Sequence, residues 1–272
     1  MKLSVFGATG FVGRNFLKLY PNHIPIKRNI LKPETDNILY LISTVHNYNI
    51  FEDITKDVKV NLELLCKILE NCKSKNITFN FISSWFVYGK NCKLPASESH
   101  ICNPTGFYSI TKKCAEDLLI SFCNTFEVNY RIIRLCNVLG KGDEGASSQK
   151  NAATWMINLI KENKSINLYD EGEVYRDYLH VHDVCQAIDL ICRKGTKNEI
   201  YNVSSGNPTK VKYLIDLAYK FSNSKSKINY IKPPTFHTNV QNKDFWMENK
   251  KIEQLGFKQT IFIEEIVREL CI

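Results

Sequence analysis

The sequence has no apolar run that approaches the roughly 20 residues needed to span a bilayer. It also has no internal repeat, no low-complexity tract and no linker rich in proline or glycine. Hydrophobic residues make up 44% and charged residues 24% of its 272 residues, which excludes disordered and collagen-like classes. Residues 1–6, before the first glycine, are too short for the apolar core of a signal peptide. We therefore expect a cytoplasmic protein with no membrane partner.

Cysteine is abundant, but none of the ten cysteines forms a Cys-x-x-Cys pair. Several lie in apolar stretches, such as Cys66 and Cys136, and we expect reduced thiols packed in the core. His180 and His182 lie two residues apart, but no Cys or acidic partner recurs with zinc-like spacing. The sequence therefore predicts no metal site.

The net charge is +8, from 36 basic and 28 acidic residues. Such a surface favours the attraction of an anionic ligand. The basic residues are dispersed, and no aromatic platform is interleaved with them, so no nucleic-acid partner is predicted. The charge by itself does not identify the ligand.

Strand-like and helix-like segments alternate through the first 135 residues. The expected strands are 3–6, 24–27, 37–43, 77–83 and 130–135, and the expected helices are 11–20, 54–69 and 107–126. Alternation with short connections predicts an α/β fold, in which a doubly wound parallel sheet has helices on both faces. Ligands of such sheets bind at the carboxyl ends of the strands.

A glycine-rich segment, Gly7-Ala8-Thr9-Gly10-Phe11-Val12-Gly13, joins the first strand to the first helix. Gly7 permits a tight turn, Gly10 lets a pyrophosphate approach the backbone, and Gly13 lets the helix pack closely on the strand. The free N–H groups at the helix start then hold the phosphates. In this context the motif predicts a Rossmann-like, dinucleotide-binding fold, with the cofactor at Gly7, Thr9, Gly10, Phe11, Val12 and Gly13.

The pattern loosens after about residue 140. A loop is expected at 140–145, helices at 155–162 and 183–193, and a strand at 200–203. We predict that residues 1–140 form the dinucleotide-binding domain and that 141–272 form mainly a smaller α/β substrate-binding lobe.

Two segments carry candidate catalytic residues. Tyr108 and Lys112 lie four apart at the start of a predicted helix, which puts them on one face. A lysine beside a phenol lowers the pKa of the phenol, which becomes a usable general acid or base near neutrality. By itself such a pair is usually a solvated helix face. Ser84 ends a predicted strand, where its hydroxyl either caps the strand end or faces the ligand crevice.

Together these motifs resemble the extended short-chain dehydrogenase/reductase family of nucleotide-sugar epimerases, dehydratases and reductases. The resemblance covers nearly the whole chain. Residues 134–140, 175–184 and 201–206 resemble the Arg-x-x-Asn-Val-Tyr-Gly, Arg-Asp-Phe-x-His-Val-x-Asp-Val and Tyr-Asn-Val-Gly-Ser-Gly segments of the family, in order. Val60-Asn61 resembles the helix that carries the active-site asparagine.

The resemblance implies a role for each residue. Tyr108 would exchange a proton with the sugar oxygen, and Ser84 would hydrogen-bond the same oxygen. Lys112 would hold the cofactor ribose and lower the pKa of Tyr108, while Asn61 would support Lys112 through water.

The implied substrate is a small nucleotide-diphosphate sugar. Asn137 and Arg176 would meet its diphosphate, because the arginine fork matches phosphate oxygens. Without the family context, a turn residue and a surface ion pair would be the simpler interpretations of these two positions.

Differences between this sequence and the family's motifs exclude several of the family's reactions. Trp85 and Phe86 stand where 4,6-dehydratases carry an Asp-Glu pair, and neither aromatic can exchange a proton. Decarboxylases resembling the family place a Glu at the position of Phe86. Enzymes similar to GDP-fucose synthase need a Cys and a His where this chain has Phe86 and Gly142. We expect both aromatics to contact the substrate.

After these exclusions, the reaction that remains is hydride transfer at a single carbon of the sugar. The leading expectation is NADPH-dependent reduction of a 4-keto group on an NDP-deoxyhexose. The alternative is an NDP-sugar 4-epimerase with tightly bound NAD. A non-catalytic dinucleotide sensor on the same fold is a third hypothesis, against which the intact Ser84, Tyr108 and Lys112 argue.

The cofactor preference depends on the end of the second strand. NAD-preferring family members usually have an acidic residue there. This chain instead has Lys27 and Arg28, whose positive charges would attract the 2′-phosphate of NADP(H). NAD remains the alternative cofactor. The short stretch 14–42 predicts that the third strand of the family is missing. By analogy with the family, helices at 52–72 and 107–125 would form a homodimer.

Overall fold

A six-stranded parallel sheet lies at the centre of the computed structural model, which describes residues 1–90, 92–240 and 243–272. Its strand order is β10-β5-β4-β3-β1-β2. The strands are β1 (Leu3–Phe6), β2 (Ile24–Pro25), β3 (Asn37–Tyr40), β4 (Thr78–Ser84), β5 (Asn129–Leu135) and β10 (Glu199–Val203). All four residues of β1 are buried, as expected for a strand covered on both faces. The predicted doubly wound α/β fold is confirmed.

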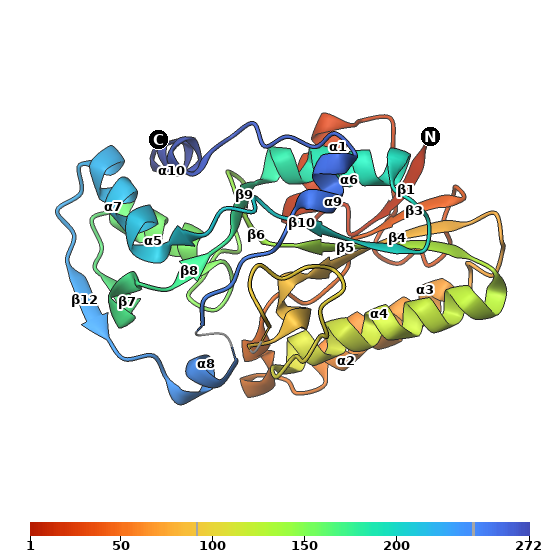
Figure 1. Cartoon of the computed structure of the whole chain (residues 1–272), viewed down its shortest axis with the longest axis horizontal. Coiled ribbons are helices and arrows are strands. Elements are labelled where there is room, and N and C mark those ends of the chain that lie inside the picture. The colour runs from red at the N-terminus through yellow and green to blue at the C-terminus, as the bar shows by residue number, and fades with distance from the viewer. Residues whose placement is uncertain (91, 241–242) are drawn as a thin grey trace.

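Helices cover both faces of this sheet (Figure 1). One face carries α1 (Phe11–Leu19) and α6 (Val181–Lys194), and α9 (Lys250–Gln254) lies beside β10. The other face carries α4 (Phe107–Phe126) and a second helical stretch made of α2 (Lys56–Val58), the π-helical turn η2 (Lys59–Glu63) and α3 (Leu64–Leu69). The connections of the sheet therefore lie on both of its sides, with α1 on one side and α2, α3 and α4 together on the other.

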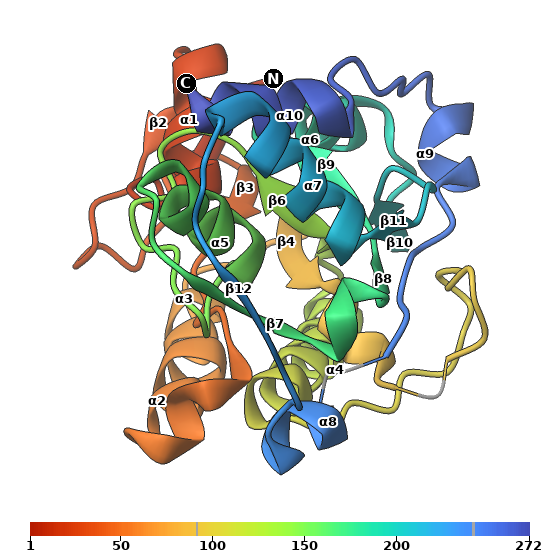
Figure 2. The same ribbon diagram turned by 90° about the vertical axis from the view of Figure 1, so that its left-hand side faces the viewer.

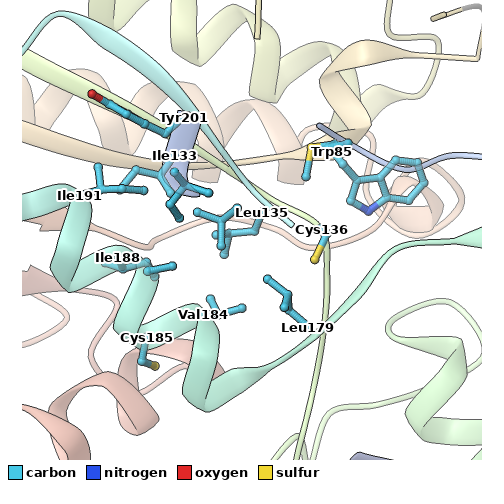
Figure 3. Packing of buried hydrophobic residues seen from close by; sticks show 14 of the residues in the cluster. Trp85, Ile133, Leu135, Cys136, Leu179, Val184, Cys185, Ile188, Ile191 and Tyr201 are labelled. Carbon is cyan, nitrogen blue, oxygen red and sulfur yellow. The ribbon is translucent and has the colours of Figure 1, made fainter. Parts of the chain in front are cut away.

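A separate hydrophobic core lies on each face. On the α1/α6 face, side chains of α6 meet those of β5 and β10 (Figure 3): Val184, Cys185, Ile188 and Ile191 lie against Ile133, Leu135 and Tyr201. On the other face, Leu65, Ile68, Ala115 and Leu119 pack against the sheet through Phe79 and Phe81. These cores hold the carboxyl ends of β1, β3, β4 and β5 at one edge.

Three of the differences between predicted and observed elements have a physical cause in the structure. β3 ends at Tyr40 rather than at residue 43, because its partner β1 turns away at Gly7, where φ is +82°. β2 ends at Pro25, which has no N–H to donate and is tolerated only at a sheet edge. The predicted helix 54–69 is interrupted by η2, the turn that carries Asn61.

The third strand of the family is missing, as predicted. β2 is the edge strand, and the described residues between β2 and β3 include no further strand.

The later part of the chain forms a third core and also returns to the sheet. Helices α5 (Ala152–Lys161), α7 (Val211–Ser222) and α10 (Ile263–Cys271) pack together, and Figure 2 shows them next to one another. Short strand pairs join this part: β6 (Asn137–Leu139) with β9 (Tyr178–His180), β7 (Ile166–Tyr169) with β12 (Ile228–Ile231), and β8 (Tyr175–Arg176) with β11 (Thr209–Lys210). The remaining helical elements are η1 (Asn47–Phe51), η3 (Trp85–Tyr88), η4 (Asp170–Gly172) and α8 (Thr235–Val240).

Across the described ranges, no helix is long and apolar enough to cross a membrane. The same residues contain no group of three or more His, Cys, Asp or Glu side chains that could hold a metal ion. The ten cysteines are all free thiols.

Candidate active site

A cavity of about 690 Å³ opens at the carboxyl ends of the sheet strands. Its walls come from the glycine-rich turn, from the ends of β3, β4 and β5, and from the C-terminal core around α5 and β7. This is the edge at which ligands of doubly wound sheets bind, and the volume is in the range of small-molecule sites.

The glycine-rich turn forms one end of the cavity. A Cβ on Gly13 would lie 2.3 Å from the carbonyl oxygen of Gly7, so helix and strand approach as only glycine allows. Gly7, Gly10, Phe11, Val12 and Gly13 line the cavity, and the side chain of Thr9 is exposed outside the lining. No side chain caps the start of α1, which leaves its backbone N–H groups for phosphate oxygens. The turn therefore fits a dinucleotide.

Tyr108 and Ser84 meet on the cavity wall. Tyr108, in the first turn of α4, is 6% exposed, and hydrogen bonding with the Ser84 and Ser43 hydroxyls acts on its phenol. Burial raises the pKa of Tyr108 to about 12, and these two serines act in the opposite direction. The expected lowering of this pKa by Lys112 is not observed: burial is the largest influence, and the groups that lower the pKa are Ser84 and Ser43. The phenol is therefore protonated at neutral pH.

Lys112 lies one turn further along α4 and is 2% exposed. Its Nζ donates a 2.7 Å hydrogen bond to the carbonyl oxygen of Ile82 and lies 4.1 Å from the ring centroid of Phe81. Burial lowers the pKa of Lys112 to about 7. The lysine is thus bound to β4, the strand that ends at Ser84.

Asn47 holds the start of α4 in place, a role that the sequence did not reveal. Its Oδ1 accepts hydrogen bonds from the backbone N–H and the hydroxyl of Ser109, at 3.1 and 3.0 Å. A Cβ on Gly106 would lie 2.0 Å from this oxygen, so the contact requires glycine there. No local signal could indicate a cap that comes from 62 residues away.

Asn61 lies in η2 and is 2% exposed. Its Oδ1 accepts from Ser43 Oγ at 3.0 Å and from the backbone N–H of Thr44 at 2.9 Å. Its Nδ2 donates to the hydroxyls of Thr44 and Thr111, at 2.8 and 2.9 Å. The amide is therefore occupied by four protein groups, none of which is Lys112.

An aromatic wall continues from Ser84. The rings of Trp85 and Phe86 stack with centroids 3.9 Å apart, and Phe86 meets Tyr108 edge to face at 5.8 Å. The guanidinium of Arg176 lies 5.8 Å from the centroid of Trp85. The structure thus places Trp85, Phe86 and Arg176 together in the cavity that holds Tyr108.

Asn137, on β6, and Arg176, on β8, line the same cavity. Asn137 Nδ2 donates to the carbonyl oxygen of Asp177 at 2.9 Å. Arg176 donates to the carbonyl oxygens of Tyr175, at 2.9 Å, and of Lys243. Burial lowers the pKa of Arg176, so its charge is held in a desolvated position.

Lys27 and Arg28 follow β2 and are exposed. They lie outside the cavity lining, at the edge of the sheet next to β1, whose carboxyl end leads into the glycine-rich turn.

Several residues that line the cavity belong to none of the sequence motifs. The opposite wall includes Trp155, Met156, Asn167 and Tyr169, and a loop in which Lys150 pairs with Asp143 at 3.1 Å. His237 also reaches the cavity, with its Nδ1 3.0 Å from the hydroxyl of Tyr48. Burial lowers the pKa of His237 to about 4, so it is neutral.

Comparison with known proteins agrees with this geometry. The model of the NAD dependent epimerase/dehydratase family matches residues 28–204, more than half of the chain. GDP-6-deoxy-D-mannose reductase of Pseudomonas aeruginosa is 28% identical over 239 residues, which cover 79% of this chain and 78% of that protein.

Solved structures share the fold. UDP-glucose 4-epimerase of Thermotoga maritima, solved with UDP-glucose, superposes with a TM-score of 0.89 at 21% identity, covering 100% of this chain and 97% of that one. RMD of Pseudomonas aeruginosa, complexed with NADPH, superposes with a TM-score of 0.85 at 24% identity, covering 99% and 97%. With the family match over residues 28–204, these findings show that the chain belongs to the NAD-dependent epimerase/dehydratase family.

Proposed function

We propose that this protein is an NADPH-dependent reductase of a 4-keto group on a nucleotide-diphosphate-linked deoxyhexose. The observation that carries the proposal is the meeting of Ser84, Tyr108 and Lys112 in a cavity that also contains the glycine-rich turn. The similarity to a GDP-6-deoxy-D-mannose reductase supports the same direction of reaction.

A bound nicotinamide would supply the hydride. Tyr108 is protonated near neutrality, since its pKa is raised to about 12, and gives its proton to the carbonyl oxygen of the sugar. The Ser84 hydroxyl donates to the same oxygen and orients it. Lys112, on α4 and anchored to β4 through the carbonyl oxygen of Ile82, holds the cofactor ribose.

The nucleotide sugar lies along the aromatic wall. Trp85 and Phe86 give the sugar an apolar surface beside Tyr108 and supply no acid or base for elimination. Asn137 and Arg176 hold the diphosphate, for which a desolvated guanidinium is well suited.

Lys27 and Arg28 select NADP(H) over NAD in this proposal. Both are exposed basic residues at the end of β2, where a 2′-phosphate attracts positive charge. Residues 1–140 would serve mainly the dinucleotide and 141–272 mainly the sugar, in a cytoplasmic enzyme.

A 4-epimerase with tightly bound NAD is the second candidate. The TM-score of 0.89 to a UDP-glucose 4-epimerase favours it, because the cavity of an epimerase is built on the same fold. In that reaction Tyr108 would take a proton in one half and return it in the other.

Cofactor identity separates the two candidates. The purified protein is denatured, any released dinucleotide is identified, and the emptied protein is titrated with NADPH and NADH. The reductase predicts an empty protein that binds NADPH better and oxidises it with a nucleotide-linked 4-keto sugar. Stoichiometric NAD that survives purification would favour the epimerase, and tight binding without turnover of any nucleotide sugar would favour a sensor.

We also propose a homodimer through α4 and the α2–α3 stretch. Ile54, Val58, Ile110 and Leu118 are between 39% and 56% exposed, an apolar surface that a second copy would cover. Sedimentation equilibrium tests this, and Val58→Glu with Ile110→Glu is expected to give monomers. A monomeric wild-type protein at micromolar concentration would contradict the proposal.

A further inference from the structure

Four charged side chains line the cavity within the described ranges: Lys112, Asp143, Lys150 and Arg176. Under the proposed function two diphosphates enter this cavity, one with the dinucleotide and one with the nucleotide sugar. Lys112 is bound to β4, and burial lowers its pKa to about 7, so it carries only part of a charge near neutrality. The proposed mechanism uses Arg176 but leaves Asp143 and Lys150 without a role.

Asp143 and Lys150 lie in the loop between β6 and α5. Lys150 Nζ donates to Asp143 Oδ1 at 3.1 Å, and Asp143 Oδ2 accepts a second hydrogen bond from Asn151 Nδ2 at 2.8 Å. The side chain of Asp143 is 3% exposed, whereas that of Lys150 is 28% exposed. The carboxylate is therefore enclosed by the loop, and the lysine is the partner that a ligand can reach.

Two contacts hold this loop without the side chain of Lys150. Asn151 Nδ2 donates to the carbonyl oxygen of Val138 on β6 at 3.0 Å. Arg14, on α1, donates to the carbonyl oxygen of Gly142 at 2.8 Å. The loop is thus fastened both to β6 and to the helix that follows the glycine-rich turn. The ammonium group of Lys150 is not needed for either contact.

Lys150 has hydrogen-bonding capacity left for a ligand. An ammonium group has three N–H donors, and in the described part of the chain its Nζ donates one hydrogen bond, to Asp143. Gly145 leaves room beside it, since a Cβ there would lie 2.6 Å from Nζ. The next residue, Asn151, is bonded to β6, the strand that begins with Asn137. The remaining donors are therefore near the proposed position of the sugar diphosphate.

We propose that Lys150 binds the diphosphate of the nucleotide sugar together with Arg176, and that Asp143 competes with this diphosphate for the lysine. The ammonium group donates charge-assisted hydrogen bonds to the phosphate oxygens. Asp143 keeps its hydrogen bond from Asn151, but its negative charge opposes the ligand. The competition limits affinity and thereby favours release of the product. This inference rests on the proposed nucleotide-sugar substrate and adds a residue that holds it.

The test measures the binding of nucleoside diphosphates without turnover. UDP, GDP and dTDP are titrated into the wild type by calorimetry, and the one that binds most tightly is used for the variants. Lys150→Met should weaken its binding by at least about tenfold, because a charge-assisted hydrogen bond is lost. Asp143→Asn keeps an oxygen for Lys150 and Asn151 but removes the competing charge, and should strengthen binding by about threefold.

The opposite signs of these two effects separate ligand binding from a structural role. If the ion pair only stabilised the loop, both variants would weaken binding. Lys164→Met is the matched control, because Lys164 pairs with Glu162 at 2.6 Å on the surface, with side chains 65% and 54% exposed. It should leave binding unchanged. Wild-type affinity in Lys150→Met, or binding in Asp143→Asn that is no tighter than in the wild type, would overturn the inference.

The double variant Asp143→Asn/Lys150→Met keeps the test valid if Lys150→Met does not fold. Lys150→Met alone leaves a buried carboxylate without its cation, which is destabilising, whereas the double variant removes both charges. It should bind the diphosphate at least about tenfold more weakly than Asp143→Asn. Equal affinity of these two proteins would contradict the role of Lys150.

NADPH is titrated into the same proteins, because the dinucleotide also carries a diphosphate. Its affinity should not change in Lys150→Met, and a loss as large as that for the nucleoside diphosphate would overturn the assignment to the nucleotide sugar. A wild type that binds none of the three nucleoside diphosphates would also overturn it. Since no measurement needs turnover, a protein that binds as described but reduces no 4-keto sugar would retain this inference and lose the proposed function.

Discussion

The Nζ of Lys112 donates a hydrogen bond of 2.7 Å to the carbonyl oxygen of Ile82. This bond joins α4, which begins next to Tyr108, to β4, which ends at Ser84. The lysine therefore ties α4 to β4, the two elements that carry the candidate catalytic hydroxyls. It does so from a buried position, where a charge is costly.

That burial makes protein stability depend on pH. The pKa of Lys112 falls from 10.5 to about 7 on folding. Between these values the unfolded chain binds a proton that the folded protein does not, so the free energy of unfolding rises with pH across this window. Lys112→Met should stabilise the protein by on the order of 2 kcal/mol at pH 7, and the gain should shrink toward pH 10. Urea unfolding at several pH values measures this, and a gain independent of pH would contradict it.

Tyr108→Phe should lower turnover by at least about a hundredfold, because general acid catalysis by a positioned group has this magnitude. Dinucleotide binding, measured by calorimetry, should remain. Tyr178 also lines the cavity, and Tyr178→Phe is the matched control that should keep most of the activity. Full turnover in Tyr108→Phe would remove this residue from the mechanism.

Gly13→Ala should destabilise the protein by about 1–3 kcal/mol and abolish dinucleotide binding, because the added Cβ would lie 2.3 Å from the Gly7 carbonyl oxygen. Gly10→Ala is the comparison, since its nearest neighbour lies at an ordinary 3.4 Å. Thermal unfolding and calorimetry should show the larger loss for Gly13. Equal stability of the two variants would be inconsistent with the close packing.

Lys27→Ala with Arg28→Ala should weaken NADPH binding by about tenfold and leave NADH binding nearly unchanged, because only NADPH carries the 2′-phosphate. Lys18→Ala, also exposed but on α1, is the control for loss of surface charge. Fluorescence titration with both cofactors gives the selectivity ratio. A parallel loss for both cofactors would argue against a 2′-phosphate contact.

Arg134 and Glu116 form a buried bidentate pair between β5 and α4, at 3.0 and 2.7 Å, with both side chains at most 2% exposed. Glu116→Gln should cost about 3–5 kcal/mol by leaving the guanidinium uncompensated. The double variant Glu116→Leu/Arg134→Met should recover most of that loss. Chemical denaturation of the wild type and the two variants tests this, and a double variant that is no more stable than Glu116→Gln would contradict it.

Much of the fold could be predicted from the sequence because its signals are local. The predicted helix 107–126 coincides with α4, and the predicted strand 3–6 with β1, since apolar spacing over one segment reports which face is buried. The glycine-rich turn could be predicted for the same reason, because the backbone geometry of a single strand-to-helix connection requires Gly7 and Gly13. Element ends were less accurate, because β3 stops where β1 leaves it.

The contacts around Tyr108 were decided only by the tertiary structure. Asn47 and Ser43 lie more than 60 residues before it, and no spacing rule connects them to α4. The pKa of Tyr108 also follows from this assembly: the sequence places a lysine four residues away, which predicts a lowered pKa, but burial raises it. Sequence motifs thus identify the reacting groups. The protonation and orientation of these groups depend on desolvation and on hydrogen bonds that exist only when distant segments pack together.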